Sequence, residues 1–265
     1  MTEKVWIEAE RLGFSHGPQK ALSEISLKFY PGRHYILAGP NGAGKSTLMD
    51  LLANLKKPAE GGIMVRGRPM AAYQPLELAK ALALAPQEFR FNFAFTVREV
   101  VAMGRRPYLG RWGRLGADDH KIVEESIEAL NLEDMADKSV TALSGGERQR
   151  VVAARTLAQQ TPIILLDEPT SGLDIAHALA LMDLARRKAE GGSLVITVTH
   201  DLNLAAAFGH EIVFLKKGRL AAAGPLADAF TSEILAKVYE AEARVEQNDF
   251  TAGPAALFRL PSPAP

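Results

Sequence analysis

The chain has 265 residues, of which 47% are apolar and 23% charged, a composition that argues against disordered, collagen-like and coiled-coil architectures. It carries 31 basic and 31 acidic side chains, and a net charge of zero argues against a nucleic-acid-binding protein. The absence of cysteine excludes disulfides, thiolate metal sites and a catalytic thiol. The length fits one large domain with an attached lobe.

The sequence contains no stretch of about 18 apolar residues, so it predicts no membrane-spanning helix. The N-terminus has no apolar run of the kind found in secretory signal peptides. We therefore expect a cytosolic protein.

The first third of the chain is predicted to be mostly β structure, because apolar and polar residues alternate there. A glycine-rich loop follows the third apolar run, and helical spacing begins at Lys45. A short helix is predicted over 74–82. The predicted strands of this part lie at 5–10, 25–29, 34–38, 63–65 and 82–85.

Residues 96–160 are predicted to be mostly helical, with Thr96 and Ser144 as the first residues of two capping boxes. From 162 onward strands and helices alternate, which predicts a parallel sheet with helices on both faces. The tail from 252 to 265 is rich in Pro and Ala and is expected to be poorly ordered. The predicted elements of the second half are strands at 163–166, 194–198 and 212–215 and helices at 121–130, 175–189 and from 202.

The segment 39–46 reads GPNGAGKS and matches the phosphate-binding pattern G-x-x-x-x-G-K-[S/T]. Its glycines permit positive φ angles and a close approach of the backbone amides to an anion. The helix that begins near Lys45 adds its N-terminal dipole. The alternative is a simple glycine turn before a helix. The residues predicted to bind a nucleotide here are Gly39, Asn41, Gly42, Gly44, Lys45, Ser46 and Thr47.

Three side chains of this loop have separate predicted roles. Lys45 supplies a positive charge to the β- and γ-phosphate oxygens, and Ser46 supplies a hydroxyl ligand to Mg²⁺. Thr47 is placed to reach the α-phosphate.

An apolar strand over 163–166 ends in two acids, Asp167 and Glu168, which Pro169 follows. Parallel sheets bind ligands at the carboxyl ends of their strands. Asp167 is predicted to bind Mg²⁺ directly or through water, and Glu168 to polarise the attacking water as general base. The alternative is a capped strand with two solvated acids.

The segment 143–149 reads LSGGERQ and places a hydroxyl and two glycines at a predicted helix start. Such a start is itself an anion site. The chain therefore has two predicted phosphate-binding helix starts, near Lys45 and Ser144.

With these motifs the sequence resembles the ATP-binding cassette ATPases over about residues 3–240. Residues 143–147 are similar to the signature motif of that family. Gln87 resembles its Q-loop glutamine, which implies roles in catalysis and at Mg²⁺. Asp174 resembles the D-loop aspartate, and His200 the switch histidine that contacts the γ-phosphate.

The resemblance also implies an α/β fold: a P-loop NTPase with a mixed sheet core, an antiparallel β subdomain and a helical subdomain at about 88–160. The ATPase domain would span 1–240, and 241–265 would be a partly disordered C-terminal extension. The adenine-stacking position, usually Tyr, is occupied by His16, and Phe14 is the alternative.

The resemblance implies a head-to-tail dimer with ATP and Mg²⁺ as cofactors. Each ATP would lie between the Lys45 loop of one copy and the signature residues Ser144, Gly145 and Gly146 of the other. A single chain then holds only half of each site.

Three segments, 101–114, 173–177 and 200–204, are similar to the ATPases of importers for iron–siderophore, haem and cobalamin. This implies two transmembrane permease subunits, a periplasmic or lipid-anchored binding protein, and a peripheral location on the cytoplasmic side of the inner membrane. The alternative is a non-transport cassette, such as a scaffold for cofactor assembly.

Phe89, Phe91, Phe93 and Phe95 alternate directly after Gln87, which predicts one aromatic face of an extended segment. The rings either pack beneath the helical lobe or line a groove for a short helix of the membrane partner.

Overall fold

The computed structural model describes residues 4–87, 89, 93–110, 113–249 and 253–259. Within these ranges no helix combines the length and the apolar character that crossing a membrane requires.

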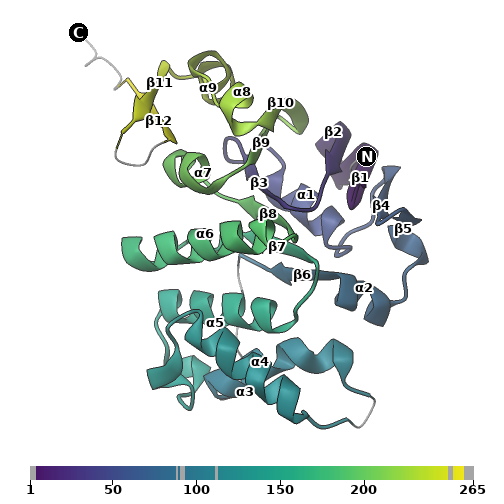
Figure 1. The fold of residues 1–265 in the computed structure, drawn as a ribbon. Helices are drawn as coiled ribbons and strands as arrows, with labels where there is room; N and C mark the ends of the chain where they lie inside the picture. Colours follow the sequence, from purple (N-terminus) through teal and green to yellow (C-terminus); the bar gives the residue numbers. More distant parts are fainter. Residues whose placement is uncertain (1–3, 88, 90–92, 111–112, 250–252, 260–265) are drawn as a thin grey trace.

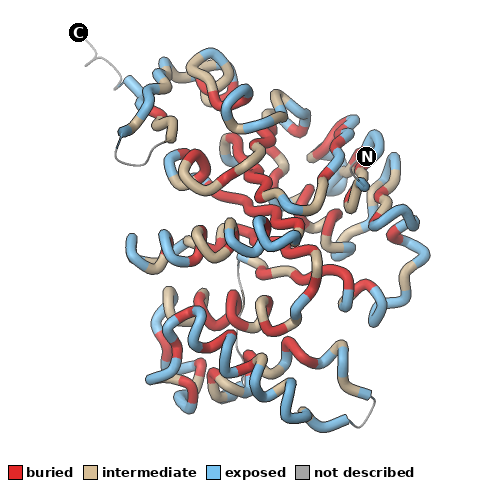
Figure 2. Tube along the Cα trace, in the orientation of Figure 1, coloured by how far each residue is buried: buried red, intermediate tan, exposed pale blue. Residues whose placement is uncertain are grey.

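A six-stranded sheet in the order β10-β9-β3-β8-β7-β6 forms the centre of the molecule, and Figure 2 shows it as the most buried part. β3, β6, β7, β8 and β9 are parallel to their neighbours, whereas β10 is antiparallel to β9. The carboxyl ends of the parallel strands therefore meet at one edge. The strands are β3 (Arg33–Ala38), β6 (Leu82–Ala85), β7 (Ile163–Asp167), β8 (Leu194–Val198), β9 (Glu211–Lys216) and β10 (Arg219–Pro225).

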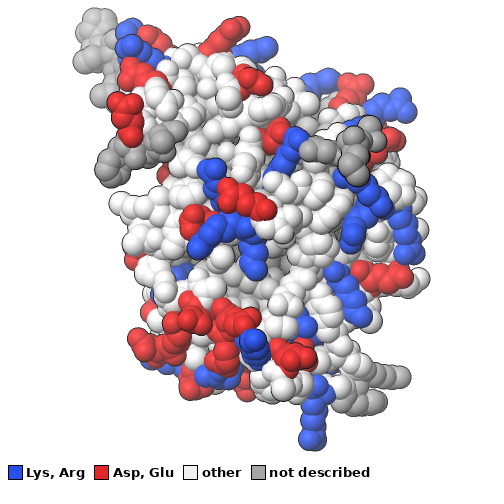
Figure 3. All heavy atoms as spheres, viewed as in Figure 1, with Lys and Arg blue, Asp and Glu red and all other residues white. Residues whose placement is uncertain are grey.

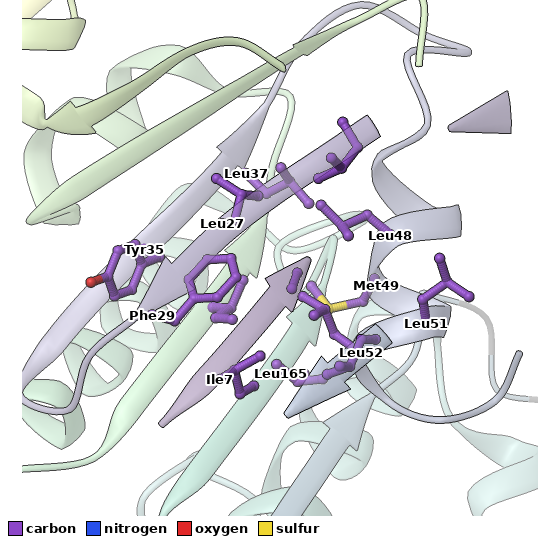
Figure 4. Close-up of a cluster of buried hydrophobic side chains, with 14 of the residues drawn as sticks. Ile7, Leu27, Phe29, Tyr35, Leu37, Leu48, Met49, Leu51, Leu52 and Leu165 are labelled. Atoms are coloured by element: carbon purple, nitrogen blue, oxygen red, sulfur yellow. The ribbon is translucent and has the colours of Figure 1, made fainter. Parts of the chain in front are cut away.

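A second, antiparallel sheet in the order β2-β1-β4-β5 lies beside one face of the central sheet (Figure 1). Helix α1 (Lys45–Leu52) packs between them: Leu48 and Met49 belong to one buried cluster with Ile7, Phe29 and Leu165, and Figure 4 shows Met49 and Leu52 beside Leu165. The strands of this sheet are β1 (Ile7–His16), β2 (Gln19–Phe29), β4 (Glu60–Val65) and β5 (Arg68–Pro69).

The opposite face of the central sheet is covered by helices. Alternate side chains of one strand point to opposite faces, so Ile163 and Leu165 join the core around α1 whereas Ile164 and Leu166 contact α5 and α6. The helices of this layer are α5 (Gly145–Ala158), α6 (Ile175–Glu190) and α7 (Leu202–Phe208).

The helical lobe at the lower end of Figure 1 has an apolar core of its own, which includes Val97, Val101, Ile127 and Val151. The elements of this lobe and of its connection to the sheet are η1 (Met70–Ala72), α2 (Pro75–Ala81), α3 (Val97–Ala102), η2 (Met103–Tyr108), α4 (Ala117–Glu128), η3 (Glu133–Met135) and η4 (Val140–Ala142). On the face shown in Figure 3, acidic side chains gather over this lobe, and basic side chains lie mainly toward the antiparallel sheet.

Both predicted capping boxes are confirmed. The Thr96 hydroxyl accepts from the Glu99 amide, and the Glu99 carboxylate accepts from the Thr96 amide. Ser144 and Glu147 make the same reciprocal pair at the start of α5. The sequence pattern alone therefore locates these two helix starts.

The structure differs from the expectation for one part of the C-terminal tail, over 253–258, whereas residues 252 and 260–265 lie outside the described residues. After α8 (Leu226–Ala229) and α9 (Ser232–Tyr239), strands β11 (Ala243–Asn248) and β12 (Gly253–Phe258) pair as an antiparallel hairpin. The hairpin is ordered because α7 and α9 cover it: Ala256 is buried in one cluster with Ala205 and Leu235. The Pro and Ala content of the tail gives no sign of these tertiary contacts.

Candidate nucleotide-binding site

The phosphate loop connects β3 to α1 at the carboxyl edge of the sheet. Gly39 has φ +142°, and a Cβ there would lie 2.1 Å from the carbonyl oxygen of Leu215 on β9. Gly44 has φ +102°, and its Cβ would lie 2.9 Å from the Ala21 carbonyl oxygen. Only glycine satisfies both the backbone conformation and the close approach, so β9 and β2 shape the loop from outside.

Lys45 folds back over the loop that precedes it. Its ammonium group donates to the carbonyl oxygens of Gly39 at 2.8 Å and Pro40 at 3.0 Å. Only 5% of the residue is exposed. Burial lowers the pKa of Lys45, and the nearby carboxylates of Glu168 and Asp167 act in the opposite direction. The loop thus holds a partly desolvated positive charge at its centre.

Asp167 ends β7 with a buried carboxylate. Burial raises its pKa to about 6, with a further rise from Glu168, whereas Lys45 and the Ser46 hydroxyl act in the opposite direction. Its Oδ1 atom has no hydrogen-bond partner among the described residues. An unpaired carboxylate oxygen beside a hydroxyl is a donor set that fits Mg²⁺, which favours oxygen ligands and few protein groups.

Glu168 is the centre of a side-chain cluster. Its Oε2 accepts from the Gln87 amide at 2.7 Å, and its Oε1 lies 2.5 Å from Nε2 of His200. The backbone of Glu168 is left-handed, with φ +48°, and its amide donates to the Val198 carbonyl oxygen on β8 at 3.1 Å. This strained backbone turns the carboxylate toward its neighbours, as is common at functional sites.

The sheet order explains this convergence. Gln87 follows β6, Glu168 follows β7 and His200 follows β8, and these three strands are adjacent and parallel. Each side chain therefore leaves the same edge of the sheet within two residues of its strand.

A groove of about 790 Å³ joins the phosphate loop to this cluster. It also contains residues that the sequence motifs do not single out: Lys217 and Gly218 form the β9–β10 turn, and the Gly218 amide donates to the Ala43 carbonyl oxygen at 3.1 Å. The turn is recognisable in the sequence, but its position over the loop is not. The predicted site residues that line the groove are His16, Asn41, Gly42, Gly44, Lys45, Ser46, Thr47, Gln87, Glu168 and His200.

Gln149 is a further contact that the motifs do not reveal. It lies on α5, and its side-chain amide donates to the carbonyl oxygen of Glu168 at 3.4 Å. This hydrogen bond connects α5, the helix that begins at the signature motif, to Glu168 of the same chain.

The two aromatic alternatives at the groove occupy different positions. His16 is exposed at the rim, with Nε2 at 3.2 Å from the Thr47 hydroxyl. Phe14 is half-buried behind it, packs edge-on against the His16 ring at 5.0 Å, and has the Lys56 ammonium over its own ring. His16 therefore has the more direct access to the groove.

The signature and D-loop residues lie outside the groove. Ser144 and Gly145 are exposed at the start of α5, and a Cβ at Gly146 would lie 2.7 Å from the Gly172 carbonyl oxygen. Asp174 caps α6 by accepting from the His177 amide at 2.9 Å, which lowers the pKa of Asp174. One chain does not bring these residues to its own phosphate loop.

The aromatic segment after Gln87 divides into two environments. Phe89 is half-buried against the core, with the Arg155 guanidinium 4.3 Å from its ring centre. Phe93 and Phe95 are 70% and 40% exposed, with ring centres 6.0 Å apart. Phe91 lies outside the described residues.

Comparison with known proteins matches residues 22–171 to the ABC transporter family. The chain is 40% identical over 253 residues to the hemin import ATP-binding protein HmuV of Thermobifida fusca, covering 96% of this chain and 88% of that protein. It is 34% identical over 252 residues to the iron(3+)-hydroxamate import ATP-binding protein FhuC of Bacillus subtilis, covering 95% of this chain and 94% of that protein.

Solved structures that resemble this chain belong to the same family as these relatives. A metal-chelate type ABC transporter in an inward-facing conformation superposes with a TM-score of 0.81 at 28% identity, covering 96% of this chain and 97% of that chain. A dimeric post-hydrolysis ATP-binding cassette bound to ADP and Pi gives 0.74 at 30% identity, covering 83% of this chain and 98% of that chain. The fold class and the family resemblance read from the motifs are confirmed. The chain belongs to the ABC transporter family, as one of its ATP-binding, ATP-hydrolysing subunits.

Proposed function

We propose that this chain powers an importer of a metal chelate, such as an iron–siderophore complex, haem or cobalamin. Relatives named as hemin and iron(3+)-hydroxamate import proteins support an iron chelate and favour transport over the alternative of a non-transport cassette. The observation that carries the ATP-hydrolysing part of the proposal is the convergence of the Lys45 loop and the Glu168 cluster on one groove.

In this proposal the triphosphate lies in the phosphate loop. The amides that follow the loop glycines donate to its oxygens, and Lys45 exchanges the carbonyl oxygens of Gly39 and Pro40 for the β- and γ-phosphate oxygens. Thr47 reaches the α-phosphate. His16 stacks on the adenine, which its position at the rim supports. Gly39, Asn41, Gly42 and Gly44 complete the loop.

Mg²⁺, when bound, would neutralise the charge that develops on the phosphates. Ser46, Asp167 and Gln87 would hold it. The unpaired Oδ1 of Asp167 supports this assignment, because a buried carboxylate oxygen without a partner is otherwise costly.

Glu168 would accept the proton of the attacking water, and His200 would contact the γ-phosphate. Both oxygens of Glu168 are engaged by Gln87 and His200. Each carboxylate oxygen can accept a second hydrogen bond, so the attacking water would bind Glu168 beside the Gln87 or His200 contact.

A second copy would complete each site with its own Ser144, Gly145, Gly146 and Asp174. None of these residues lines the groove of the same chain, and Ser144, Gly145 and Asp174 are exposed, which supports this arrangement. We propose residues 1–240 as the ATPase domain, with a helical subdomain at about 88–160 and a C-terminal extension at 241–265.

Two transmembrane permease subunits would dock beside the helical lobe. A groove of about 670 Å³ between α2 and η2 supports this, because Leu76 and Met103 expose apolar surface along it. The chain would thus sit peripherally on the cytoplasmic side of the inner membrane. A periplasmic or lipid-anchored binding protein would act on it only through the permease.

The proposal is tested by changing Glu168 to Gln. The amide keeps the size of the side chain but cannot accept the proton of water, so we expect ATP binding to persist while turnover falls by about 10²-fold or more. The measurement is phosphate release at saturating ATP together with ATP binding. The exposed Glu133→Gln is the matched control and should leave turnover unchanged. Near-normal turnover of the Glu168→Gln protein would remove Glu168 from the role of general base.

A further inference from the structure

Helix α7 begins at Leu202, two residues after His200. Asp201 caps this helix by accepting from the amides of Asn203 and Leu204, each at 2.9 Å. His200 lies one residue before the cap and contacts Glu168. The position of His200 therefore depends on where the first turn of α7 is held.

The C-terminal hairpin contacts that first turn. The side-chain oxygen of Asn203 accepts from the Ala256 amide on β12 at 2.9 Å. The hairpin has only two strands, so this amide lies on an unpaired strand edge, and Asn203 satisfies it. A two-stranded hairpin is marginal alone, and Ala256 packs in the apolar cluster that contains Ala205 of α7.

The other side of the hairpin is anchored away from α7. The Ser232 hydroxyl of α9 accepts from the Val245 amide on β11 at 2.8 Å. The Phe258 ring packs edge-on against Tyr239 at 5.9 Å, and Tyr239 packs edge-on against Phe214 of β9 at 6.4 Å. The hairpin thus connects the first turn of α7 to the central sheet through α9.

The far end of α7 is held from a different direction. His34 of β3 contacts the Phe208 carbonyl oxygen at 3.0 Å, and Arg186 of α6 donates to the Ala207 carbonyl oxygen at 3.1 Å. These contacts fix the last turn, four to five residues beyond Asn203. The first turn, next to His200, is held by the Asp201 cap, the Asn203 contact, the Asp201 amide that donates to the Thr199 hydroxyl at 3.1 Å, and the buried Leu202.

We propose that Asn203 is a positioning residue for His200. Its hydrogen bond to Ala256 of the β11–β12 hairpin holds the first turn of α7, and with it His200, in place. The inference rests on the proposed role of His200 at the γ-phosphate. It gives a role to Asn203, which lies in a segment typical of importer ATPases but outside the nucleotide groove. It also gives a role to the C-terminal hairpin.

The test compares full-length variants at saturating ATP. Asn203→Ala removes the acceptor for the Ala256 amide, so we expect kcat to fall about fivefold with the KM for ATP within about twofold of the parent. Asn203→Asp keeps an oxygen at the same place and should restore most of kcat. Gln247→Ala, an exposed change on β11, is the matched control and should leave kcat unchanged.

A double-mutant cycle with His200→Ala distinguishes an effect of Asn203 on the position of His200 from a general loss of stability. If Asn203 acts through His200, Asn203→Ala should not slow the residual single-turnover hydrolysis of His200→Ala any further. Thermal unfolding of each variant shows whether stability follows the same pattern. An equal loss of kcat in both backgrounds would overturn the proposal, as would a normal kcat for Asn203→Ala.

The cycle also distinguishes this failure from failure of the proposed function. If His200→Ala alone leaves kcat unchanged, His200 has no role at the γ-phosphate, and the Asn203 proposal fails with it. If His200→Ala lowers kcat but Asn203→Ala does not, His200 keeps its proposed role and only the positioning role of Asn203 and the hairpin is wrong.

Discussion

His34 is a histidine that the fold keeps neutral. It is completely buried on β3, with Nε2 at 2.8 Å from the Thr197 hydroxyl and Nδ1 at 3.0 Å from the Phe208 carbonyl oxygen. Burial lowers its pKa from the ordinary 6.5 to about 4. The strand that leads into the phosphate loop therefore depends on an uncharged imidazole.

This pKa predicts a pH dependence of stability. Above pH 6.5 His34 is neutral in both the folded and unfolded chains, so its contribution to stability is fully present. Between pH 6.5 and pH 4 His34 is protonated in the unfolded chain but remains neutral in the folded chain, so the free energy of unfolding falls as the pH is lowered. The expected loss from His34 between pH 7 and pH 5 is about 2 kcal/mol.

The measurement is urea unfolding at both pH values for the parent protein and His34→Gln. The variant should lose less stability on acidification, by about the same 2 kcal/mol. His120→Gln, at an exposed position on α4, is the control and should keep the parent's pH dependence. Identical pH dependence in the parent and His34→Gln would show that burial of His34 does not set the acid sensitivity.

At the scale of single residues, the sequence predicts chemical types better than conformations. It identifies Glu168 as an acid at the end of a strand, but not its left-handed backbone. Neither the contacts of Glu168 with Gln87 and His200 nor the contact from Gln149 follows from local spacing. They depend on the order of β6, β7 and β8, which the chain order does not give.

At the scale of elements, Arg105 connects three pieces of the helical lobe. Its side chain lies in η2, is 7% exposed, and donates to Asp119 of α4 and to the Ala158 carbonyl oxygen that ends α5, each within 2.9 Å. The hydrogen bonds to Arg105 and to the Gly116 amide lower the pKa of Asp119. The three elements thus share one buried cation.

Removing this cation should loosen the lobe. Arg105→Ala leaves the Asp119 carboxylate with only the Gly116 amide among these partners and the Ala158 carbonyl oxygen without its guanidinium donor, so we expect a loss of about 3 kcal/mol in the free energy of unfolding. Arg187→Ala is the control, because its pair with Asp183 on α6 is mostly exposed and should matter by about 0.5 kcal/mol or less. Urea unfolding measures both. Equal effects of the two changes would mean that burial does not strengthen the Arg105 contacts.

Elements whose stability is local could be predicted from the sequence, and elements that depend on tertiary contacts could not. The capping boxes at Thr96 and Ser144 carry their own hydrogen-bond partners three residues away. The β11–β12 hairpin is different, since its order comes from α7 and α9 rather than from its own composition. The sequence therefore predicts these two helix starts but not the β11–β12 hairpin.

At the scale of the whole molecule, the arrangement of the two phosphate-binding helix starts matters most. The groove at Lys45 and the exposed start of α5 at Ser144 do not meet within one chain. The sequence shows both starts but not the distance between them. The folded chain keeps the signature residues out of the groove at Lys45, which supports the proposal that a second copy brings its signature motif to each phosphate loop.

The last prediction concerns this second copy, and uses Glu168→Gln as the parent because slow hydrolysis lets an ATP-bound dimer accumulate. Ser144→Arg places a large cation where the partner's ATP would lie, so we expect the double variant to bind ATP with a Kd within about twofold of the parent but to keep the mass of one chain. Loss of the Ser144 cap costs about 1 kcal/mol and should not prevent folding.

Light scattering with and without ATP measures the mass, and nucleotide binding is measured on the same samples. Ser139→Arg, at a half-buried capping serine of the lobe, is the control and should still form the ATP dimer. If Ser144→Arg forms the dimer normally, the site shared between copies is wrong. If it instead abolishes ATP binding by the single chain, Ser144 belongs to the site of its own chain, and the exposed start of α5 must approach the Lys45 groove by a movement of the helical lobe.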